Sequence, residues 1–174
     1  MNSTLYKGGP ASDEQPVRAP ENSRGPDSQG TPRRPRILVV EDDADIMRCL
    51  AIRLKINGFD VSGASDLQSA LDLANKCEPD AAIFDVSFPG GDGMMLTQAL
   101  RANPATADLP VMLLTASMRP GIEEEALAAG ANGFMRKPYN ADALVKELTR
   151  WCNLDDSELD RAEAEPEGQG TGRG

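Results

Sequence analysis

Residues 81–93 read Ala-Ala-Ile-Phe-Asp-Val-Ser-Phe-Pro-Gly-Gly-Asp-Gly, and this stretch decides the fold. Four apolar residues end in the carboxylate of Asp85, and a turn rich in glycine follows at residues 89–93. A short apolar run bounded by a turn is typical of a strand that is buried on both faces. In open α/β sheets, ligands bind at the carboxyl ends of such strands, which is where Asp85 stands.

Residues 36–43, Arg-Ile-Leu-Val-Val-Glu-Asp-Asp, repeat this pattern near the start of the chain. An apolar strand again ends in acids, here Glu41 and Asp42, and a single lysine, Lys137, follows a short strand further on. Carboxylate oxygens are the ligands that hard divalent cations prefer, and an ammonium group suits a phosphoryl oxygen. The pattern therefore predicts a site for a divalent cation and a phosphoryl group.

Between residues 36 and 152, apolar runs of strand length alternate with segments of helical period. Strands are expected at Ile37–Val40, Phe59–Gly63, Ala81–Phe84, Val111–Leu114 and Gly133–Arg136. Helices are expected to begin near Ala44 after an Asp43 cap, at the Ser65–Gln68 capping box, near Gly93, near Ile122 and after Asn140. Five strands that are each followed by a helix predict an α/β fold, a flavodoxin-like doubly wound five-stranded parallel sheet with helices on both faces.

The two ends of the chain have a different composition. Residues 1–35 form an arm rich in proline and glycine, residues 153–174 form an acidic tail, and both are expected to be disordered because they offer little apolar surface to bury. Residues 36–152 then form the single domain. The basic group at residues 33–36 is interpreted as a solvated linker end rather than as a contact for an acidic partner.

Charge and residue types exclude several classes of function. The formal charge is −10, and residues 37–152 hold 17 acidic against 10 basic side chains, so direct binding to a nucleic-acid backbone is not expected. The chain has no histidine, which excludes histidine triads, histidine metal ligands and a phosphohistidine carrier. Three cysteines without a Cys-x-x-Cys pair indicate free thiols in a reducing compartment. Without a signal-like or membrane-spanning apolar run, the protein is expected in the cytoplasm with no membrane insertion.

At this point the chain resembles the receiver domain of the response regulators of bacterial two-component signalling, over residues 36–152. The resemblance rests on Glu41-Asp42 after the first strand, Asp85 after the third, Thr115 after the fourth, and Lys137-Pro138 after the fifth. The order and the spacing of these positions match the family closely.

The resemblance implies a role for each matched residue. Asp85 would be the phosphoacceptor, and a sensor histidine kinase or a histidine phosphotransfer protein would supply the phosphoryl group. Lys137 would contact a phosphoryl oxygen. Asp42, Asp85 and the backbone carbonyl of Ser87 would hold Mg²⁺, with Glu41 reaching the ion through water; Mn²⁺ would also fit. Thr115 would be the switch hydroxyl and Phe134 the aromatic side chain that packs inward with it. The family holds the Lys-Pro bond in cis.

These roles imply a single-domain response regulator that acts on an unknown downstream protein target, since no further core segment follows residue 152. Its readout surface would lie between Arg119 and Trp151. The chain is not expected to be an enzyme, beyond Mg²⁺-assisted self-phosphorylation and self-dephosphorylation.

Two alternatives belong to other classes of protein. The first is a phosphorylation-independent receiver-like interaction module, against which the intact Asp85, Thr115 and Lys137 argue. The second is a Mg²⁺-dependent phosphohydrolase of the haloacid-dehalogenase type. Such an enzyme carries a second acid two residues after the nucleophile, where this chain has Ser87.

Overall fold

The computed structural model describes residues 33–154, and five of its strands form one parallel sheet in the order β2-β1-β3-β6-β7. These strands are β1 (Arg36–Val40), β2 (Asp60–Ala64), β3 (Ala81–Asp85), β6 (Val111–Thr115) and β7 (Gly133–Arg136). The predicted flavodoxin-like doubly wound sheet is confirmed. Most of the expected disordered arm and acidic tail falls on residues 1–32 and 155–174, which lie outside the described residues.

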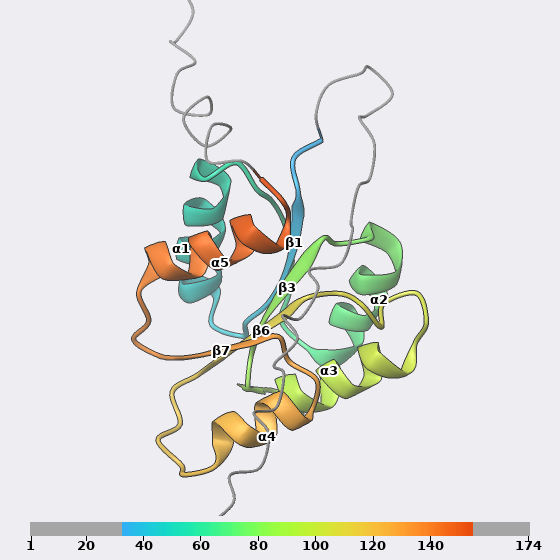
Figure 1. The fold of residues 1–174 in the computed structure, drawn as a ribbon, viewed down its shortest axis with the longest axis vertical. Helices are drawn as coiled ribbons and strands as arrows, with labels where there is room; N and C mark the ends of the chain where they lie inside the picture. Colours follow the sequence, from blue (N-terminus) through green and yellow to red (C-terminus); the bar gives the residue numbers. More distant parts are fainter. Residues whose placement is uncertain (1–32, 155–174) are drawn as a thin grey trace, which may run out of the picture.

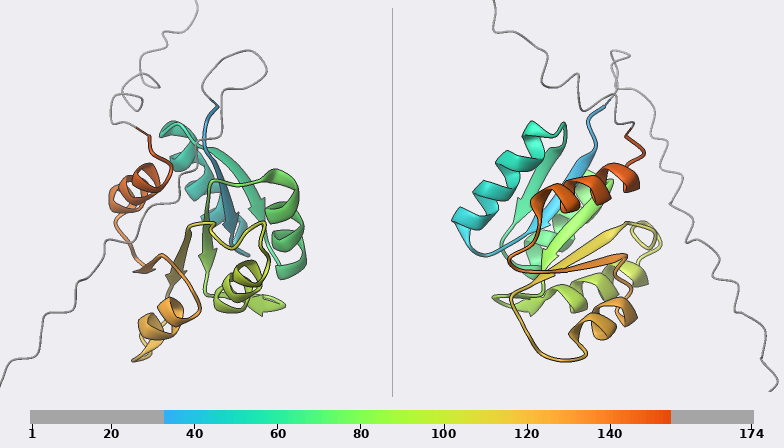
Figure 2. Two further views of the ribbon diagram at one scale, coloured as in Figure 1. Left: turned by 45° about the vertical axis from the view of Figure 1, so that its right-hand side comes forward. Right: turned by 60° about the vertical axis from the view of Figure 1, so that its left-hand side comes forward.

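Five helices cover the two faces of this sheet (Figures 1 and 2). They are α1 (Ala44–Ile56), α2 (Leu67–Cys77), α3 (Gly93–Ala102), α4 (Ile122–Ala128) and α5 (Ala141–Trp151). Helices α1 and α5 pack on one face, and α2, α3 and α4 pack on the other. Among the residues that the structure describes, no helix has the length and apolar character needed to cross a bilayer.

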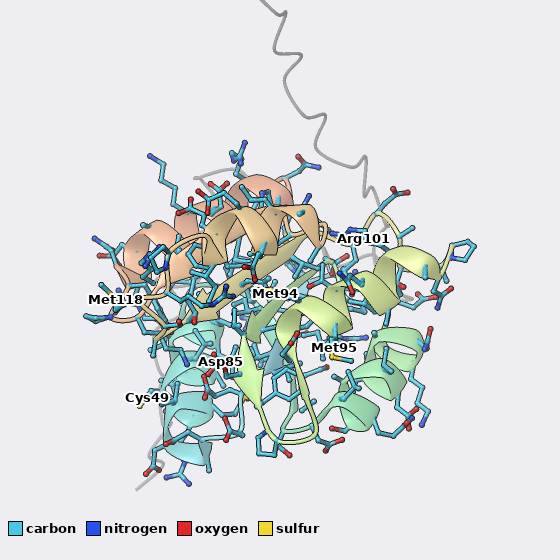
Figure 3. All side chains as sticks on the ribbon, turned by 90° about the horizontal axis from the view of Figure 1, so that it is seen from below. Cys49, Asp85, Met94, Met95, Arg101 and Met118 are labelled. Atoms are coloured by element: carbon cyan, nitrogen blue, oxygen red, sulfur yellow. The ribbon has the colours of Figure 1, made fainter. Side chains whose placement is uncertain are left out.

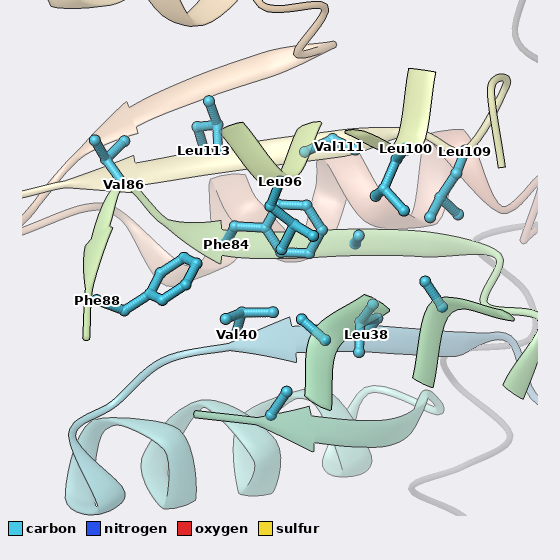
Figure 4. Packing of buried hydrophobic residues seen from close by; sticks show 14 of the residues in the cluster. Leu38, Val40, Phe84, Val86, Phe88, Leu96, Leu100, Leu109, Val111 and Leu113 are labelled. Atoms are coloured by element: carbon cyan, nitrogen blue, oxygen red, sulfur yellow. The ribbon is translucent and has the colours of Figure 1, made fainter. Parts of the chain in front are cut away.

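The central strands are apolar at nearly every position because both of their faces are buried. In β1, Leu38 and Val40 face the cluster under α2, α3 and α4, whereas Ile37 and Val39 face the cluster under α1 and α5. Figure 4 shows the first of these clusters, in which Phe84 of β3 lies among leucine and valine side chains from neighbouring elements. Two packed layers thus hold the sheet between them.

Parallel pairing brings the carboxyl ends of the strands to one edge of the sheet. Val40, the last residue of β1, pairs with Phe84 of β3, and Asp85, the last residue of β3, pairs with Leu114 of β6. Thr115, the last residue of β6, pairs with Arg136 of β7. The residues that follow these pairs therefore emerge side by side at that edge.

Helices α1 and α5 begin at the caps that the sequence predicted, Asp43 and Asn140, whereas the start of α2 differs. The Asp43 carboxylate accepts hydrogen bonds from the backbone of Asp45 and Ile46 at 2.9 and 3.0 Å, as predicted for the cap of α1. The expected capping box at Ser65 is wrong, because α2 is capped one residue later. There the Asp66 carboxylate accepts the backbone N–H of Ser69 at 2.9 Å and its hydroxyl at 2.7 Å.

A short hairpin after β3, with two residues in each strand, was not expected from the sequence. Strands β4 (Ser87–Phe88) and β5 (Gly91–Asp92) pair antiparallel across the turn that the sequence indicated at residues 89–93. The buried ring of Phe88 anchors the hairpin to the core under α2 and α3. The hairpin leads straight into α3, which Asp92 caps by accepting the backbone N–H of Met95 at 2.7 Å.

The interpretation of residues 33–36 as a solvated linker end is wrong for Arg33 and Arg36. The guanidinium of Arg33 donates to both oxygens of the Asp80 carboxylate at 2.7 Å, and the backbone N–H of Arg36 donates to the same group at 2.7 Å. The Arg36 side chain also donates to the carbonyl of Cys77. Asp80 is buried, and a buried carboxylate is stable only with such partners.

Gly93 at the start of α3 gives the first prediction. A Cβ atom at this position would lie 2.5 Å from the carbonyl oxygen of Asp85 and 2.9 Å from a methyl group of Leu113. We expect Gly93→Ala to lower the free energy of unfolding by about 1–3 kcal/mol, because backbone and core must both shift. Urea denaturation measures the change.

The matched control for this prediction is Gly91→Ala. The added methyl there would lie 3.4 Å from Leu67 and Phe88, which is ordinary van der Waals contact. We expect this control to change stability by less than about 1 kcal/mol. Equal losses in the two variants would contradict the assigned crowding at Gly93.

Candidate functional site

Three carboxylates gather at the edge where the strands end. Glu41 and Asp42 follow β1, Asp85 closes β3, and each offers an oxygen that lies within 4.8 Å of the others. Glu41 is buried with 4% of its surface exposed, Asp85 is half-buried, and Asp42 is exposed. Figure 3 views the molecule from this end and shows Asp85 at the end of its strand. The structure thus brings together the acids that the sequence assigned to one site.

Lys137, in the segment after β7, supplies the positive charge of this site. Its ammonium nitrogen donates to Asp85 Oδ2 at 2.8 Å and to Glu41 Oε2 at 2.7 Å. The bond to Glu41 was not anticipated, because the sequence assigned that acid to a metal through water. The sequence signal for this bond was the position of Glu41 directly after the apolar run Ile37–Val40, where a carboxylate is too buried to stay unpaired. The Lys137–Pro138 peptide bond is cis.

The surroundings of Lys137 act on its pKa in opposite directions. Burial alone would lower the pKa, but the hydrogen bonds to Asp85 and Glu41, with the charges of both carboxylates, raise the pKa above its ordinary value. A folded-state pKa above the unfolded one means that the contribution of Lys137 to stability is present below the ordinary pKa of 10.5. That contribution is lost as the pH rises through the raised pKa.

Thr115 ends β6 beside the acids, as the sequence placed it. Its side chain is buried, and its hydroxyl oxygen accepts the backbone N–H of Ser117 at 3.0 Å. Its carbonyl oxygen accepts the backbone N–H of Lys137 at 2.7 Å. Thr115 therefore contacts both the loop that leads to α4 and the segment that carries the lysine.

Ser87 and Phe134 border the site in different ways. Ser87 is exposed, and its backbone N–H donates to Asp85 Oδ1 at 3.3 Å. Phe134 of β7 is half-buried against the cluster under α2, α3 and α4, and the guanidinium carbon of Arg136 lies 5.8 Å from its ring centre. The ring is thus already partly inside the core in this structure.

Tyr139 is a neighbour that the sequence reasoning missed. Its half-buried ring packs against the cluster under α1 and α5. Burial raises the pKa of its phenol; the charge of Lys137 opposes this shift, and the charges of Glu41 and Asp85 add to it. The available signal was an aromatic residue directly after Lys137-Pro138, which places it within the electric field of the site.

The donor set fits a divalent cation. Three carboxylates face one ammonium group, so the cluster carries a formal excess of two negative charges at neutral pH. The three acidic side chains offer only oxygen ligands, which suit Mg²⁺ and do not suit a soft metal ion. The arrangement holds a half-buried carboxylate beside a fixed ammonium group, and phosphoryl-transfer chemistry uses such a pairing of an anion with a positioned cation.

The charge excess gives the second prediction. Asp42 faces two carboxylates that share one lysine, so in the absence of divalent cations it meets net repulsion. We expect Asp42→Asn in EDTA to raise the free energy of unfolding by about 0.5 kcal/mol, measured by thermal or urea denaturation. The control is Asp45→Asn, which removes an exposed first-turn charge outside the cluster and should slightly destabilise α1. A loss of stability in Asp42→Asn would contradict the repulsion.

Comparisons with known proteins identify the family of this chain. The model of the response regulator receiver domain family matches residues 37–149. The chain is 39% identical over 114 residues to the transcriptional regulatory protein PrrA of Mycobacterium leprae, covering 66% of this chain and 48% of that protein. It is 35% identical over 113 residues to the phosphate regulon transcriptional regulatory protein PhoB of Escherichia coli, covering 65% and 49%. The chain thus spans about half the length of these curated relatives.

Solved structures show the same likeness. The chemotaxis response regulator CheY4 of Vibrio cholerae superimposes with a TM-score of 0.63 at 31% identity, covering 68% of this chain and 99% of that one. The receiver domain of the sensor histidine kinase PA1611 of Pseudomonas aeruginosa gives 0.64 at 30% identity, covering 70% and 99%. That structure holds a magnesium ion in its active-site cleft. With its family model, sheet order and strand-end acids in agreement, the chain belongs to the response regulator receiver domain family.

Proposed function

We propose that this chain accepts a phosphoryl group on Asp85 from a sensor histidine kinase or a histidine phosphotransfer protein, and then switches a face that binds a partner protein. The observation that carries the proposal is the contact between Asp85 and Lys137 at 2.8 Å, within a cluster of carboxylates at the strand ends. A carboxylate held by a cation in a partly open site is a nucleophile that an incoming phosphoryl group can reach.

The transfer forms one bond to phosphorus and breaks another. A carboxylate oxygen of Asp85 attacks phosphorus, the P–N bond of the phosphohistidine breaks, and the imidazole nitrogen keeps the electron pair. The ammonium of Lys137 offsets the charge on the phosphoryl oxygens, which is the main obstacle when two anions meet. Attack of water on the acyl phosphate later releases inorganic phosphate and restores Asp85. The chain turns over no outside substrate in this scheme and is not an enzyme in the usual sense.

Asp42, Asp85 and the carbonyl of Ser87 are the groups we assign to Mg²⁺, with Glu41 acting through water; Mn²⁺ fits the same donors. When bound, the ion neutralises charge on the phosphoryl oxygens and on the carboxylates. The bond between Glu41 and Lys137 adds a second role for Glu41, because it fixes the ammonium that must face the phosphoryl group.

Thr115 and Phe134 are assigned to the switch. The hydroxyl of Thr115 is engaged by Ser117 at 3.0 Å, so binding a phosphoryl oxygen instead would move the loop that leads to α4. The half-buried ring of Phe134 would then pack further inward. The result is a shift between two states, limited by their difference in affinity for the modified site.

The remaining assignments concern the surroundings of the protein. The downstream partner is a protein that reads the surface between Arg119 and Trp151, and the acidic described domain does not itself contact nucleic acid. Three free thiols suit a cytoplasmic location. The expectation that the receiver acts without an attached output domain stays a prediction, because the curated relatives are about twice as long.

Modification of Asp85 gives the third prediction. We expect the chain with Mg²⁺ and acetyl phosphate to gain the mass of one phosphoryl group, and Mg²⁺ with beryllofluoride to give a bound fluorine signal. Asp85→Asn should lose both signals, whereas Asp60→Asn, an exposed acid at the start of β2, should keep them. Intact-mass spectrometry and fluorine NMR provide the two readouts. Wild-type protein that stays unmodified would favour a phosphorylation-independent interaction module.

The hydroxyl of Thr115 gives the fourth prediction. Thr115→Val keeps the buried volume and removes the hydroxyl, so beryllofluoride should still bind at Asp85 without changing the amide chemical shifts of residues 116–136. Thr115→Ser keeps the hydroxyl and should retain most of those shift changes. If Thr115→Val showed the same chemical-shift changes as the wild type, the hydroxyl would have no role in the switch.

A further inference from the structure

Helix α4 is short and buries little of its own surface. It spans Ile122–Ala128, and its N-cap residue, Gly121, has no side chain that could cap it. Its buried residues are Ile122 and Ala126, whereas half of the surface of Leu127 is exposed. The main element that it contacts is β7. A helix with so small a buried face depends on its two ends for its position.

The C-terminal end of α4 is held by Arg101, the penultimate residue of α3. The Nε and Nη2 atoms of Arg101 donate to the carbonyl oxygen of Gly130 at 3.0 and 2.8 Å. The Nη1 atom donates to the carbonyl oxygen of Leu109 at 2.8 Å, just before β6. One guanidinium thus joins three segments that are distant in the sequence.

Asn132 completes this contact. Its side-chain oxygen accepts Nη2 of Arg101 at 2.8 Å and the backbone N–H of Val111 at 2.9 Å, and its own N–H donates to the carbonyl of Val111 at 2.9 Å. Gly130 has a φ of +98°, and a Cβ atom there would lie 3.0 Å from the Arg101 side chain. The chain after α4 is therefore fitted closely around the guanidinium.

The N-terminal side of α4 is held differently. Arg119 pairs with Glu125 at 2.5 and 2.6 Å, but both side chains are about half exposed and both belong to this same segment. The backbone N–H of Arg119 donates to the hydroxyl of Ser117 at 3.2 Å, and the backbone N–H of Ser117 donates to the hydroxyl of Thr115 at 3.0 Å. These bonds connect this side to Thr115, whereas none of them ties it to α3.

We propose that Arg101 is a positioning residue that fixes the C-terminal end of α4, so that switching at Thr115 displaces the N-terminal end of this helix about it. The inference rests on the proposed function, because it takes Thr115 as the residue that moves. Arg101 lies eight residues after Gly93, which abuts Asp85, or about 12 Å along the α3 axis. Figure 3 labels both residues and shows Arg101 well apart from Asp85.

Hydrogen exchange of the full chain, with and without Mg²⁺ and beryllofluoride, tests the proposal. In the wild type we expect beryllofluoride to change exchange in residues 116–125 and to leave residues 126–133 within about twofold. Arg101→Ala should raise exchange in residues 126–133 by about tenfold without beryllofluoride, which corresponds to about 1.4 kcal/mol. In this variant the change on adding beryllofluoride should extend over residues 116–133.

Two controls separate this role from a general loss of stability. Ile37→Val removes one methylene group from the core under α1 and α5, on the face of the sheet opposite α3, and should keep the wild-type pattern of beryllofluoride-dependent change. Arg101→Lys keeps the charge with fewer donors and should partly restore the confinement to residues 116–125. It also replaces the alanine variant if that variant fails to fold.

Several results would overturn the inference. One is Arg101→Ala with wild-type exchange in residues 126–133; another is a beryllofluoride effect that remains confined to residues 116–125 in that variant. Beryllofluoride bound at Asp85 without any change in residues 116–125 of the wild type would also overturn it. Absence of the fluorine signal at Asp85 would instead overturn the proposed function and the displacement, and the free-state exchange of Arg101→Ala would still decide whether the anchor exists.

Discussion

The ammonium of Lys137 is the group on which the site depends, since it holds two carboxylates from different strands at 2.7 and 2.8 Å. Without it, acids brought together by parallel strand ends would repel one another in a partly buried place. The sheet places the carboxylates close together, and the charge of the lysine offsets their repulsion. A third carboxylate, Asp42, leaves the balance negative and so leaves room for a divalent cation.

Much of the fold was predictable because local pattern and burial agree. The strand β6 is buried at every position and is almost entirely apolar in sequence, and α1 and α5 begin at residues whose side chains cap them. The capping box at Ser65 failed because two adjacent residues both suit a cap, and only packing selects Asp66. The contact of Arg33 with Asp80 joins residues 47 positions apart, a distance over which no local pattern acts.

The site was predictable to a similar degree. The residues at strand ends were found because topology alone gathers Glu41, Asp85 and Lys137 at one edge. Which oxygen each donor selects is a matter of side-chain geometry, so the bond from Lys137 to Glu41 and the half-buried phenol of Tyr139 emerged only in three dimensions. Arg101 escaped notice for the same reason, because its partners, two backbone carbonyls and the Asn132 side chain, come from distant segments of the chain.

The contact between Arg33 and Asp80 also fixes where the chain meets the domain. Arg33 precedes β1 and Asp80 precedes β3, so this pair marks the sheet edge opposite the carboxylates, and α5 runs back toward the same side (Figures 1 and 2). A five-residue strand separates the two edges by about 16 Å. A fluorescent reporter or affinity handle joined near Arg33 or Leu154 would therefore lie at the opposite end of the strands and leave the surface around Asp85 uncovered.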